Sequence, residues 1–556
     1  MFAAVRRDGG TEDAVDLGLE ILLNRLHTAR TFIRAGFAQV ESPLTTLRAL
    51  SAIHRWGPTE AGGYINAAVR NPDRAALHDE LGTLTFAELD LRTNALAHGL
   101  QGLGVVEGER VGILCRNHRG FIEAVAACSK LGAHALMLNT GFAGRQIADV
   151  CKREKPRALI FDEEFAPVLA KAGVGRTCLV AWQDSDKPGF QTLEELIATG
   201  SRENLDPPSE HGRTVVLTSG TTGTPKGVTR RHPESVGPIT SILSKIPLRA
   251  RETTTIAAPL FHSWGYSHFV LGLALSSTLV LQRRFDPEQT LAAIASSRAS
   301  TLVVVPVMLQ RILELEPEVI ARYDTSSLRV ISASGAALPG ELALRVMDTF
   351  GDVLYNLYGS TEVAWATIAT PAELRAAPGT AGTPPRGTIV KVLDSDGLEV
   401  PGGVHGRIFV GNELLFDGYN DGGTKAVIGG LMSTGDVGHL DDAGRLFISG
   451  RDDEMIISGG ENVFPREVED LLVEHEAIED VAILGVDDEQ FGQRLRAFVV
   501  LRPGATLGEE DVRNYVKDNL ARFKVPRDVI FRDSLPRNST GKVLKRELSA
   551  AKISAN

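Results

Sequence analysis

The residues best able to do chemistry form a ten-residue segment rich in glycine and hydroxyl groups. It reads Thr-Ser-Gly-Thr-Thr-Gly-Thr-Pro-Lys-Gly from Thr218 to Gly227 and follows the strand-like run 214–217. Glycines let the backbone turn so that amide N–H groups face an anion, while the hydroxyls add donors and Lys226 adds positive charge. The segment therefore predicts a loop that binds a triphosphate.

This loop differs from the P-loop of kinases and simple ATPases. The P-loop pattern places glycine before its lysine and serine or threonine after it. Here these positions hold Pro225 and Gly227, so the hydroxyl that binds Mg²⁺ in a P-loop is missing. The alternative of a flexible linker fits poorly with the apolar strand residues on either side and with the lysine.

Six further segments carry groups suited to a nucleotide and a carboxylic acid. An aromatic face suits a base, and a carboxylate is a hard oxygen ligand suited to Mg²⁺. Each segment taken alone has an ordinary alternative, such as a packed histidine, a turn or a basic surface run. The segments are Pro259–His262, Ser334–Pro339, Asn356–Glu362, Ser433–Asp436, Arg451–Asn462 and Pro536–Lys542.

Taken together and in this order, the segments resemble the adenylate-forming superfamily, which includes acyl-CoA synthetases, adenylation domains and firefly luciferase. The resemblance covers about residues 60–550 and is greatest for fatty-acid–CoA ligases. It implies that the chain activates a carboxylic acid with ATP, giving acyl-AMP and pyrophosphate, and then passes the acyl group to a thiol. One departure is Leu431, close to where many relatives have tryptophan.

The resemblance also implies roles for single residues. Lys542 is the mobile catalytic cation, which stabilises the transition state in which a carboxylate approaches the α-phosphate. Thr221 assists, Thr361 contacts the α-phosphate, Glu362 holds Mg²⁺, and His262 lines the carboxylate end of the acid pocket.

The same resemblance implies the contacts with ATP and coenzyme A. Tyr358 stacks on adenine, Asp436 and Arg451 contact the ribose, and Gly459–Gly460 lie beside the thiol. The small C-terminal domain rotates about a hinge at Asp453. The implied binding residues are Thr218, Ser219, Gly220, Thr222, Gly223, Lys226, Gly335, Ala336, Ala337, Asn356, Tyr358, Gly359, Asp436, Arg451, Gly459 and Gly460.

The acid and the thiol acceptor are less closely defined. The run 264–275 is apolar and has no lysine or arginine, which favours a medium- or long-chain fatty acid; an aryl acid is the alternative. Coenzyme A is the preferred acceptor because no obvious insertion lies between Glu362 and Asp436, and loading of a carrier protein is the alternative. Because Lys542 and Glu362 are present, a binding protein without catalysis is disfavoured. No motif indicates a luciferase-like oxygenase.

The elements that must position these residues follow an α/β pattern. Between residues 60 and 450, apolar runs alternate with helical patterns, which predicts a large multi-layer domain with mostly parallel sheets. After residue 450 a compact α+β unit is expected, giving divisions at 1–58, 59–450 and 451–556. Expected strands are 110–114, 158–161, 214–217, 301–305 and 328–331, with others near 481 and 497, and expected helices are 120–131, 287–297 and 509–522, with another starting at Pro465.

The N-terminal extension contains an amphipathic helical pattern from Leu19 to Phe37, with arginines on its other faces. Packing against the protein's own body is the favoured interpretation. Contact of residues 15–37 with a membrane surface is the alternative.

Composition limits the function further. The net charge of −11 argues against non-specific binding of nucleic acid. The four cysteines show no CxxC spacing, so neither a zinc site nor a disulfide framework is expected. No apolar run is long enough to span a membrane and no signal-peptide pattern begins the chain, so a cytoplasmic location is expected. The oligomeric state is left open.

Overall fold

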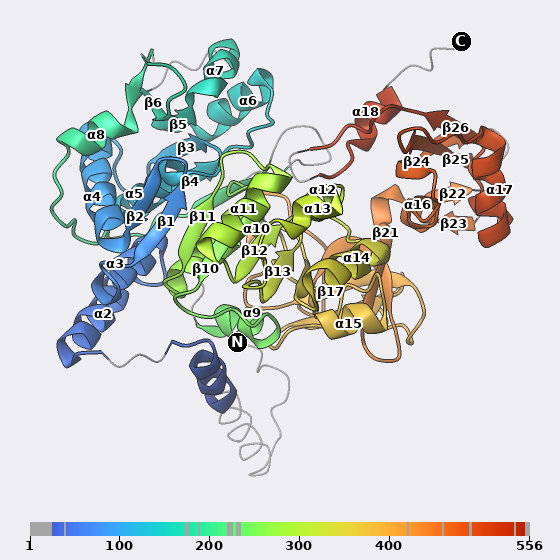
Figure 1. Cartoon of the computed structure of the whole chain (residues 1–556), viewed down its shortest axis with the longest axis horizontal. Helices are drawn as coiled ribbons and strands as arrows, with labels where there is room; N and C mark the ends of the chain where they lie inside the picture. Colours follow the sequence, from blue (N-terminus) through green and yellow to red (C-terminus); the bar gives the residue numbers. More distant parts are fainter. Residues whose placement is uncertain are drawn as a thin grey trace.

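The computed structural model describes residues 25–37, 41–172, 177–186, 189–218, 226–229, 235–419, 422–458, 461–488, 492–538 and 541–550. Figure 1 shows a large body of β-sheets and helices, and a smaller C-terminal unit, in red, at one side of it.

The first sheet has eight strands and is parallel except at its two ends. Its apolar, β-branched strands are buried on both faces, as expected for a parallel sheet covered by helices. Its order is β15 (Thr367–Ala369), β14 (Leu354–Tyr358), β13 (Val330–Ala333), β12 (Thr301–Val304), β10 (Thr253–Ile256), β11 (Thr278–Leu281), β1 (Ala75–Asp79) and β2 (Gly82–Thr85).

The second sheet also has eight strands and contains an antiparallel hairpin of the strands 214–218 and 226–229, next to its edge strand 418–419. Thr218 pairs with Lys226 across this hairpin, so the predicted triphosphate loop connects its two strands. The order is β18 (Gly418–Tyr419), β9 (Lys226–Thr229), β8 (Thr214–Thr218), β4 (His134–Met137), β3 (Arg110–Leu114), β5 (Ala158–Asp162), β6 (Thr177–Trp182) and β7 (Gln191–Thr192).

The helices of the large body carry apolar faces to both sheets. α5 is buried along its whole length, and α10 packs against both α3 and the first sheet. The helices are α2 (Pro43–Trp56), α3 (Glu60–Arg70), α4 (Phe86–Gly102), α5 (Arg119–Leu131), α6 (Gly144–Glu154), α7 (Ala166–Ala172), α8 (Leu193–Thr199), α9 (Gly237–Lys245), α10 (Ser263–Ala274), α11 (Pro287–Ser297), α12 (Pro306–Leu313), α13 (Pro317–Ala321), α14 (Gly340–Phe350) and α15 (Pro371–Ala376).

Residues 389–451 depart from the predicted parallel pattern, because they form an antiparallel sheet. Short turns join the strand 427–428 to the strand 431–440 and that strand to 446–451, and such connections produce antiparallel pairing. A longer segment, residues 394–405, joins the paired strands 389–393 and 406–411. Leu431 lies in this sheet and is buried with Leu393 and Phe409. The strands are β16 (Ile389–Leu393), β17 (Gly406–Gly411), β19 (Val427–Ile428), β20 (Leu431–Leu440) and β21 (Leu446–Arg451).

The C-terminal unit packs helices against its own mixed sheet and has a separate apolar core. Its strands are β22 (Ile456–Ser458), β23 (Glu461–Val463), β24 (Ile478–Asp488), β25 (Gly492–Leu501) and β26 (Asp528–Phe531). Its helices are α16 (Pro465–Val473), α17 (Glu509–Asn519) and α18 (Lys545–Ala550). The expected α/β architecture with a small α+β unit is confirmed.

Most predicted elements occur within one residue of their expected ends, but two are displaced by two or three residues. The strand expected at 328–331 is β13, which begins at Val330, because Leu328 still belongs to a turn closed by its N–H bond to the Thr325 carbonyl. The helix expected at 509–522 ends at Asn519, and a separate 3₁₀ turn follows at Arg522–Lys524.

Part of the predicted Leu19–Phe37 helix lies outside the described residues. Residues 25–34 are helical, and Thr31 and Ala35 are buried against the body. Among the described residues, no helix is long and apolar enough to cross a membrane.

Candidate active site

Asp436 is the centre of a compact polar cluster at the junction of two sheets. The Tyr358 hydroxyl, at the end of β14, donates a hydrogen bond of 2.5 Å to Asp436 Oδ2. Arg451 pairs with Asp436 across β20 and β21, and its Nη1 lies 3.6 Å from Asp436 Oδ1. Burial raises the pKa of Asp436, while Tyr358, Arg451 and Lys542 act in the opposite direction.

Glu362 forms the second carboxylate of the site. It follows β14 by four residues, and its Oε1 accepts a hydrogen bond of 2.7 Å from the Tyr419 hydroxyl. Burial would raise the pKa of Glu362, but hydrogen bonds from Tyr419 and Ser360 and the charge of Lys425 outweigh it, so the pKa is lowered. The carboxylate is therefore ionised and available to a cation.

Lys425 and Tyr419 also belong to this site, although neither was predicted from the sequence. A side-chain carbon placed on Gly435 would lie 3.1 Å from Lys425 Nζ, which puts this ammonium beside Asp436. The charge of Lys425 also lowers the pKa of Asp453. The surroundings of Lys425 and Tyr419 in the sequence have no distinctive spacing. The pairing of β18 with β9 places Tyr419, and the Ser433 N–H bond to the Ala426 carbonyl holds the backbone next to Lys425.

His262 lies at the N-terminus of α10, where the sequence analysis placed the carboxylate end of the acid pocket. Burial lowers the pKa of His262 to about 4, so its imidazole is neutral. The next residue, Ser263, has its hydroxyl oxygen 3.3 Å from that of Thr361. The segment that carries His262 therefore meets the segment that carries Thr361, from a distant part of the chain.

Lys542 reaches the large body on a tight C-terminal loop. Its N–H donates to Asn538 Oδ1 at 2.8 Å, and the Asn538 N–H donates to its carbonyl at 2.9 Å. Gly541 has φ +80°, and a side-chain carbon there would lie 2.5 Å from Val307 Cγ1 on α12. Only glycine allows both this turn and this approach, so the loop rests directly on the large body.

The predicted small-residue loop follows β13. Gly335 adopts φ +90°, which favours glycine, and it is exposed with Ala337, while Ala336 is partly exposed. Asn356 lies on β14, where its Oδ1 is buried without a hydrogen-bond partner. Gly359 is required because a side chain there would collide with the Ala364 carbonyl.

Several predicted site residues lie outside the described part of the chain. They are Ser219, Gly220, Thr221, Thr222 and Gly223 of the triphosphate loop, together with Gly459 and Gly460. For Thr218 and Lys226 the structure describes the strand positions alone. The hinge candidate Asp453 is described, and Arg451 Nε donates to its Oδ1 at 3.0 Å.

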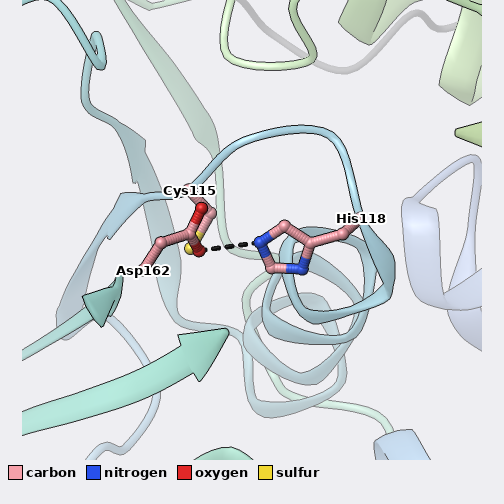
Figure 2. A group of neighbouring side chains, drawn as sticks. All are labelled: Cys115, His118 and Asp162. Carbon is pink, nitrogen blue, oxygen red and sulfur yellow. Dashed lines mark hydrogen bonds and ion pairs between the residues drawn. The ribbon is translucent and has the colours of Figure 1, made fainter. Parts of the chain in front are cut away.

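A second cluster, Cys115, His118 and Asp162, combines residue types that ligate metals (Figure 2). His118 Nε2 lies 2.7 Å from Asp162 Oδ1, and His118 Nδ1 accepts the Gly120 N–H at 3.1 Å. A neutral imidazole whose Nδ1 accepts must carry its proton on Nε2, and that proton is donated to Asp162. All three side chains are buried, and the hydrogen bonds of His118 and Asp162 tie the segment after β3, the end of β5 and the start of α5 together.

Comparison with known proteins agrees with this geometry. The profile of the AMP-binding enzyme family matches residues 64–420, and that of the AMP-binding enzyme C-terminal domain matches residues 467–542. The chain belongs to the AMP-binding enzyme family. It is an AMP-forming acid–CoA ligase, which adenylates a carboxylic acid with ATP and joins the acyl group to coenzyme A.

Relatives of this AMP-binding enzyme act on several acids. A 2-succinylbenzoate–CoA ligase of Geobacillus kaustophilus is 34% identical over 86% of this chain and 96% of its own length. A feruloyl-CoA synthase of an Amycolatopsis species is 31% identical, covering 87% and 97%. The solved o-succinylbenzoate CoA synthetase of Bacillus subtilis, in complex with its acyl-adenylate intermediate, has a TM-score of 0.76 at 27% identity, covering 88% and 98%. The aryl-acid alternative is therefore better supported than the fatty-acid expectation.

Proposed function

We propose that this enzyme activates an aromatic carboxylic acid with MgATP and transfers the aroyl or arylalkanoyl group to coenzyme A. The observation that carries the proposal is the convergence of Tyr358, Glu362, Asp436 and Lys542 beside the N-terminus of α10. This arrangement joins a nucleotide site to an acid pocket, and the related ligases named above act on aromatic acids.

In the first half-reaction, a carboxylate oxygen of the acid attacks the α-phosphorus, and the bond to pyrophosphate breaks. Two anions approach each other in this step, so cations that meet them stabilise the transition state. Lys542 is the candidate cation, since its loop rests on the large body and its charge acts on Asp436. Asp436 and Arg451 hold the ribose, and Tyr358 stacks on adenine.

The remaining nucleotide contacts follow from the loops around this centre. Thr361 contacts the α-phosphate, and His262, which is neutral, faces the carboxylate end of the acid. Small side chains let backbone groups approach the base and the phosphates. These contacts are assigned to Thr218, Ser219, Gly220, Thr221, Thr222, Gly223, Lys226, Gly335, Ala336, Ala337, Asn356 and Gly359.

Glu362 fits a magnesium ion bound together with the triphosphate. Mg²⁺ commonly binds one or two protein carboxylates while substrate phosphates and water fill its other positions. The ionised carboxylate of Glu362, fixed by Tyr419, matches this need. When bound, the ion would neutralise phosphate charge and orient the pyrophosphate leaving group.

In the second half-reaction, the thiol sulfur of coenzyme A attacks the acyl carbonyl, AMP leaves, and the thiol proton passes to solvent. Rotation of the C-terminal unit, residues 451–556, about Asp453 withdraws Lys542 and presents Gly459 and Gly460. Such a domain rotation is a conformational step able to limit turnover. Contact of Gly541 with Val307 supports the arrangement before this rotation.

The acid class is supported by the lining of α10. Phe261 lies against His262 with ring centroids 4.6 Å apart, and the Trp264 indole is fixed by its hydrogen bond to the Val304 carbonyl. The Phe261 and Trp264 side chains are buried, and an acid pocket bordered by their rings would favour a planar ring through offset or edge-on packing.

A polar pair deeper along α10 also favours a substituted acid. His268 lies six residues beyond His262, about 9 Å along the helix, and its Nε2 lies 3.1 Å from the Ser332 hydroxyl on β13. Burial lowers the pKa of His268 to about 4, so the pair is uncharged. The run 264–275 was expected to be apolar and to lack lysine and arginine, and His268 is its buried polar residue, with its second ring nitrogen 3.4 Å from the Trp264 carbonyl. A polar ring substituent able to exchange hydrogen bonds with this pair suits it better than a hydrocarbon chain.

The test is pyrophosphate release from the purified enzyme with MgATP and a panel of benzoic, cinnamic, arylalkanoic and fatty acids, each with and without coenzyme A. Aromatic acids should give the highest kcat/KM, with release rising when coenzyme A is added and an aroyl-CoA formed. A preference for fatty acids would overturn the acid class. Release independent of coenzyme A would indicate carrier-protein loading.

A substitution with a matched control tests whether the preferred acid carries a polar ring substituent. His268→Leu should lower kcat/KM by about tenfold for acids with a polar ring substituent, and leave the unsubstituted acid nearly unchanged. The matched control is Leu271→Met, which conserves volume on the same helix. Equal losses for both kinds of acid would show that His268 acts in folding alone.

A further inference from the structure

The two N-terminal helical segments, residues 25–34 and α2, touch the body through narrow faces. Thr31 and Ala35 are the buried positions of the first segment, and Ala49, Ala52 and Trp56 those of α2. Figure 1 shows both segments, in dark blue, at the periphery of the molecule. Most of each helix surface therefore faces away from the protein.

These outward surfaces are unusually apolar. Leu26 and Ile33 lie seven residues apart, on one face of the first segment, and are 58% and 67% exposed. On α2 a leucine or isoleucine recurs every third residue, so the side chains wind across the solvent side as a ridge. Of the eighteen large apolar side chains exposed in the described part of the chain, six lie here: Leu26, Ile33, Leu44, Leu47, Leu50 and Ile53. Single exposed leucines are ordinary, but such a concentration marks an interaction surface.

The same stretch is basic in an acidic protein. Residues 25–57 contain five arginines and one carboxylate, giving +4, whereas the whole chain carries −11. The one carboxylate, Glu41, is paired with Arg70 of α3 at 3.0 Å and is nearly buried. Arg48 lies on the flank of the α2 ridge, and Arg30 is four residues after Leu26. Arg55, also on α2, forms an exposed ion pair with Asp206 at 3.1 Å.

We propose that residues 25–34 and α2 bind the surface of an anionic phospholipid bilayer. The leucine and isoleucine side chains would enter the boundary between headgroups and acyl chains, and the arginines would meet lipid phosphates. A ridge that is convex and winds around a helix suits a deformable surface. A second copy of the chain fits poorly, because a symmetric contact would place +4 against +4.

The experiment is co-sedimentation of the full chain with vesicles of phosphatidylcholine alone or of an equal mixture with phosphatidylserine. Binding should require phosphatidylserine and weaken as salt is raised, because screening shortens the reach of the arginines. The double variant Leu47→Gln/Leu50→Gln should partition about tenfold more weakly. The variant Arg30→Gln/Arg48→Gln should bind less and lose most of the salt dependence.

The matched control is Leu398→Gln, since Leu398 is 65% exposed, as is Leu47, but lies far from these helices in the sequence. All variants should keep the adenylation rate measured without vesicles, which shows that they fold. Equal sedimentation of the control and the α2 variant would overturn the proposal. So would binding to neither vesicle, or a dimer in light scattering that the α2 substitutions abolish.

Discussion

Asp162 and Asp436 each accept a short hydrogen bond from an aromatic residue, His118 or Tyr358, yet their surroundings give them different roles. Asp162 lies in a closed cluster, where the His118 imidazole and the Arg116 N–H satisfy its two oxygens. Asp436 lies among charges of both signs, beside Arg451 and Lys542, which come from other strands and loops. In the Asp162 cluster both carboxylate oxygens are hydrogen-bonded within the protein. In the Asp436 cluster charged side chains lie close together and are able to interact with a charged ligand, as a binding site requires.

The largest expected effect concerns Lys542. Lys542→Ala should lower acid-dependent pyrophosphate release by about 10²–10³-fold, because a preorganised charge at the reacting anions is lost. Thioester formation from synthetic acyl-AMP and coenzyme A should change far less, since the lysine has moved away in that step. The control is Lys517→Ala on α17. A similar loss in both half-reactions would contradict the division of roles between them.

A smaller effect is expected in the closed cluster. Asp162→Asn puts an amide donor against either the His118 or the Arg116 donor, so the free energy of unfolding should fall by about 1–3 kcal/mol. Denaturant titration measures this, with Asp73→Asn at an exposed position as the control. Activity per folded molecule should be unchanged, and added Zn²⁺ should not raise the unfolding midpoint. Zinc-dependent stabilisation would show that the cluster binds metal after all.

Substitution of Lys425 tests whether the charges around Asp436 contribute to the binding of ATP. Lys425→Met should raise the KM for ATP by about tenfold, because one ammonium that faces Glu362 and Asp436 is removed. The control, Lys391→Met, removes a lysine that pairs with Glu399 on the surface. An unchanged KM would mean that Lys425 interacts with the carboxylates of the free enzyme but does not contribute to ATP binding.

The smallest expected effect is a pH dependence of stability. The pKa of His268 is about 4 in the folded protein and about 6.5 when unfolded, so below pH 6.5 the unfolded chain binds the additional proton. Stability should therefore fall as pH falls from 6.5 towards 4, by about 1 kcal/mol for this histidine at about pH 5.5, and stay flat above 6.5. Unfolding midpoints of the wild type and His268→Leu should show a shallower slope in the variant. Identical slopes would show that His268 does not contribute.

Local patterns predicted much of the fold. The strand 110–114 and the helix 287–297 have the bounds that apolar runs and a leading proline indicate. Whether such a segment is a strand or a helix depends mainly on residues close in the chain, and the spacing of apolar residues reveals it. The strand at Val330 was misplaced by two residues, since a turn bond and not hydrophobicity ends the preceding loop. The antiparallel sheet at 389–451 was missed because the strand–helix alternation that predicts parallel pairing was extended to residue 450, although the structure describes no helix between these strands.

The sequence by itself determined the chemistry: which residues offer hydroxyls, carboxylates and the C-terminal lysine, and the order in which they occur. Which of these residues become neighbours in space was decided by the tertiary structure alone. It brought Lys425 and Tyr419 to the Asp436 and Glu362 carboxylates, closed Cys115, His118 and Asp162 upon one another, and set His268 against Ser332. The reason is physical: hydrogen bonds and charges act over a few ångströms in space, and residues far apart in the chain become neighbours only through sheet pairing and core packing.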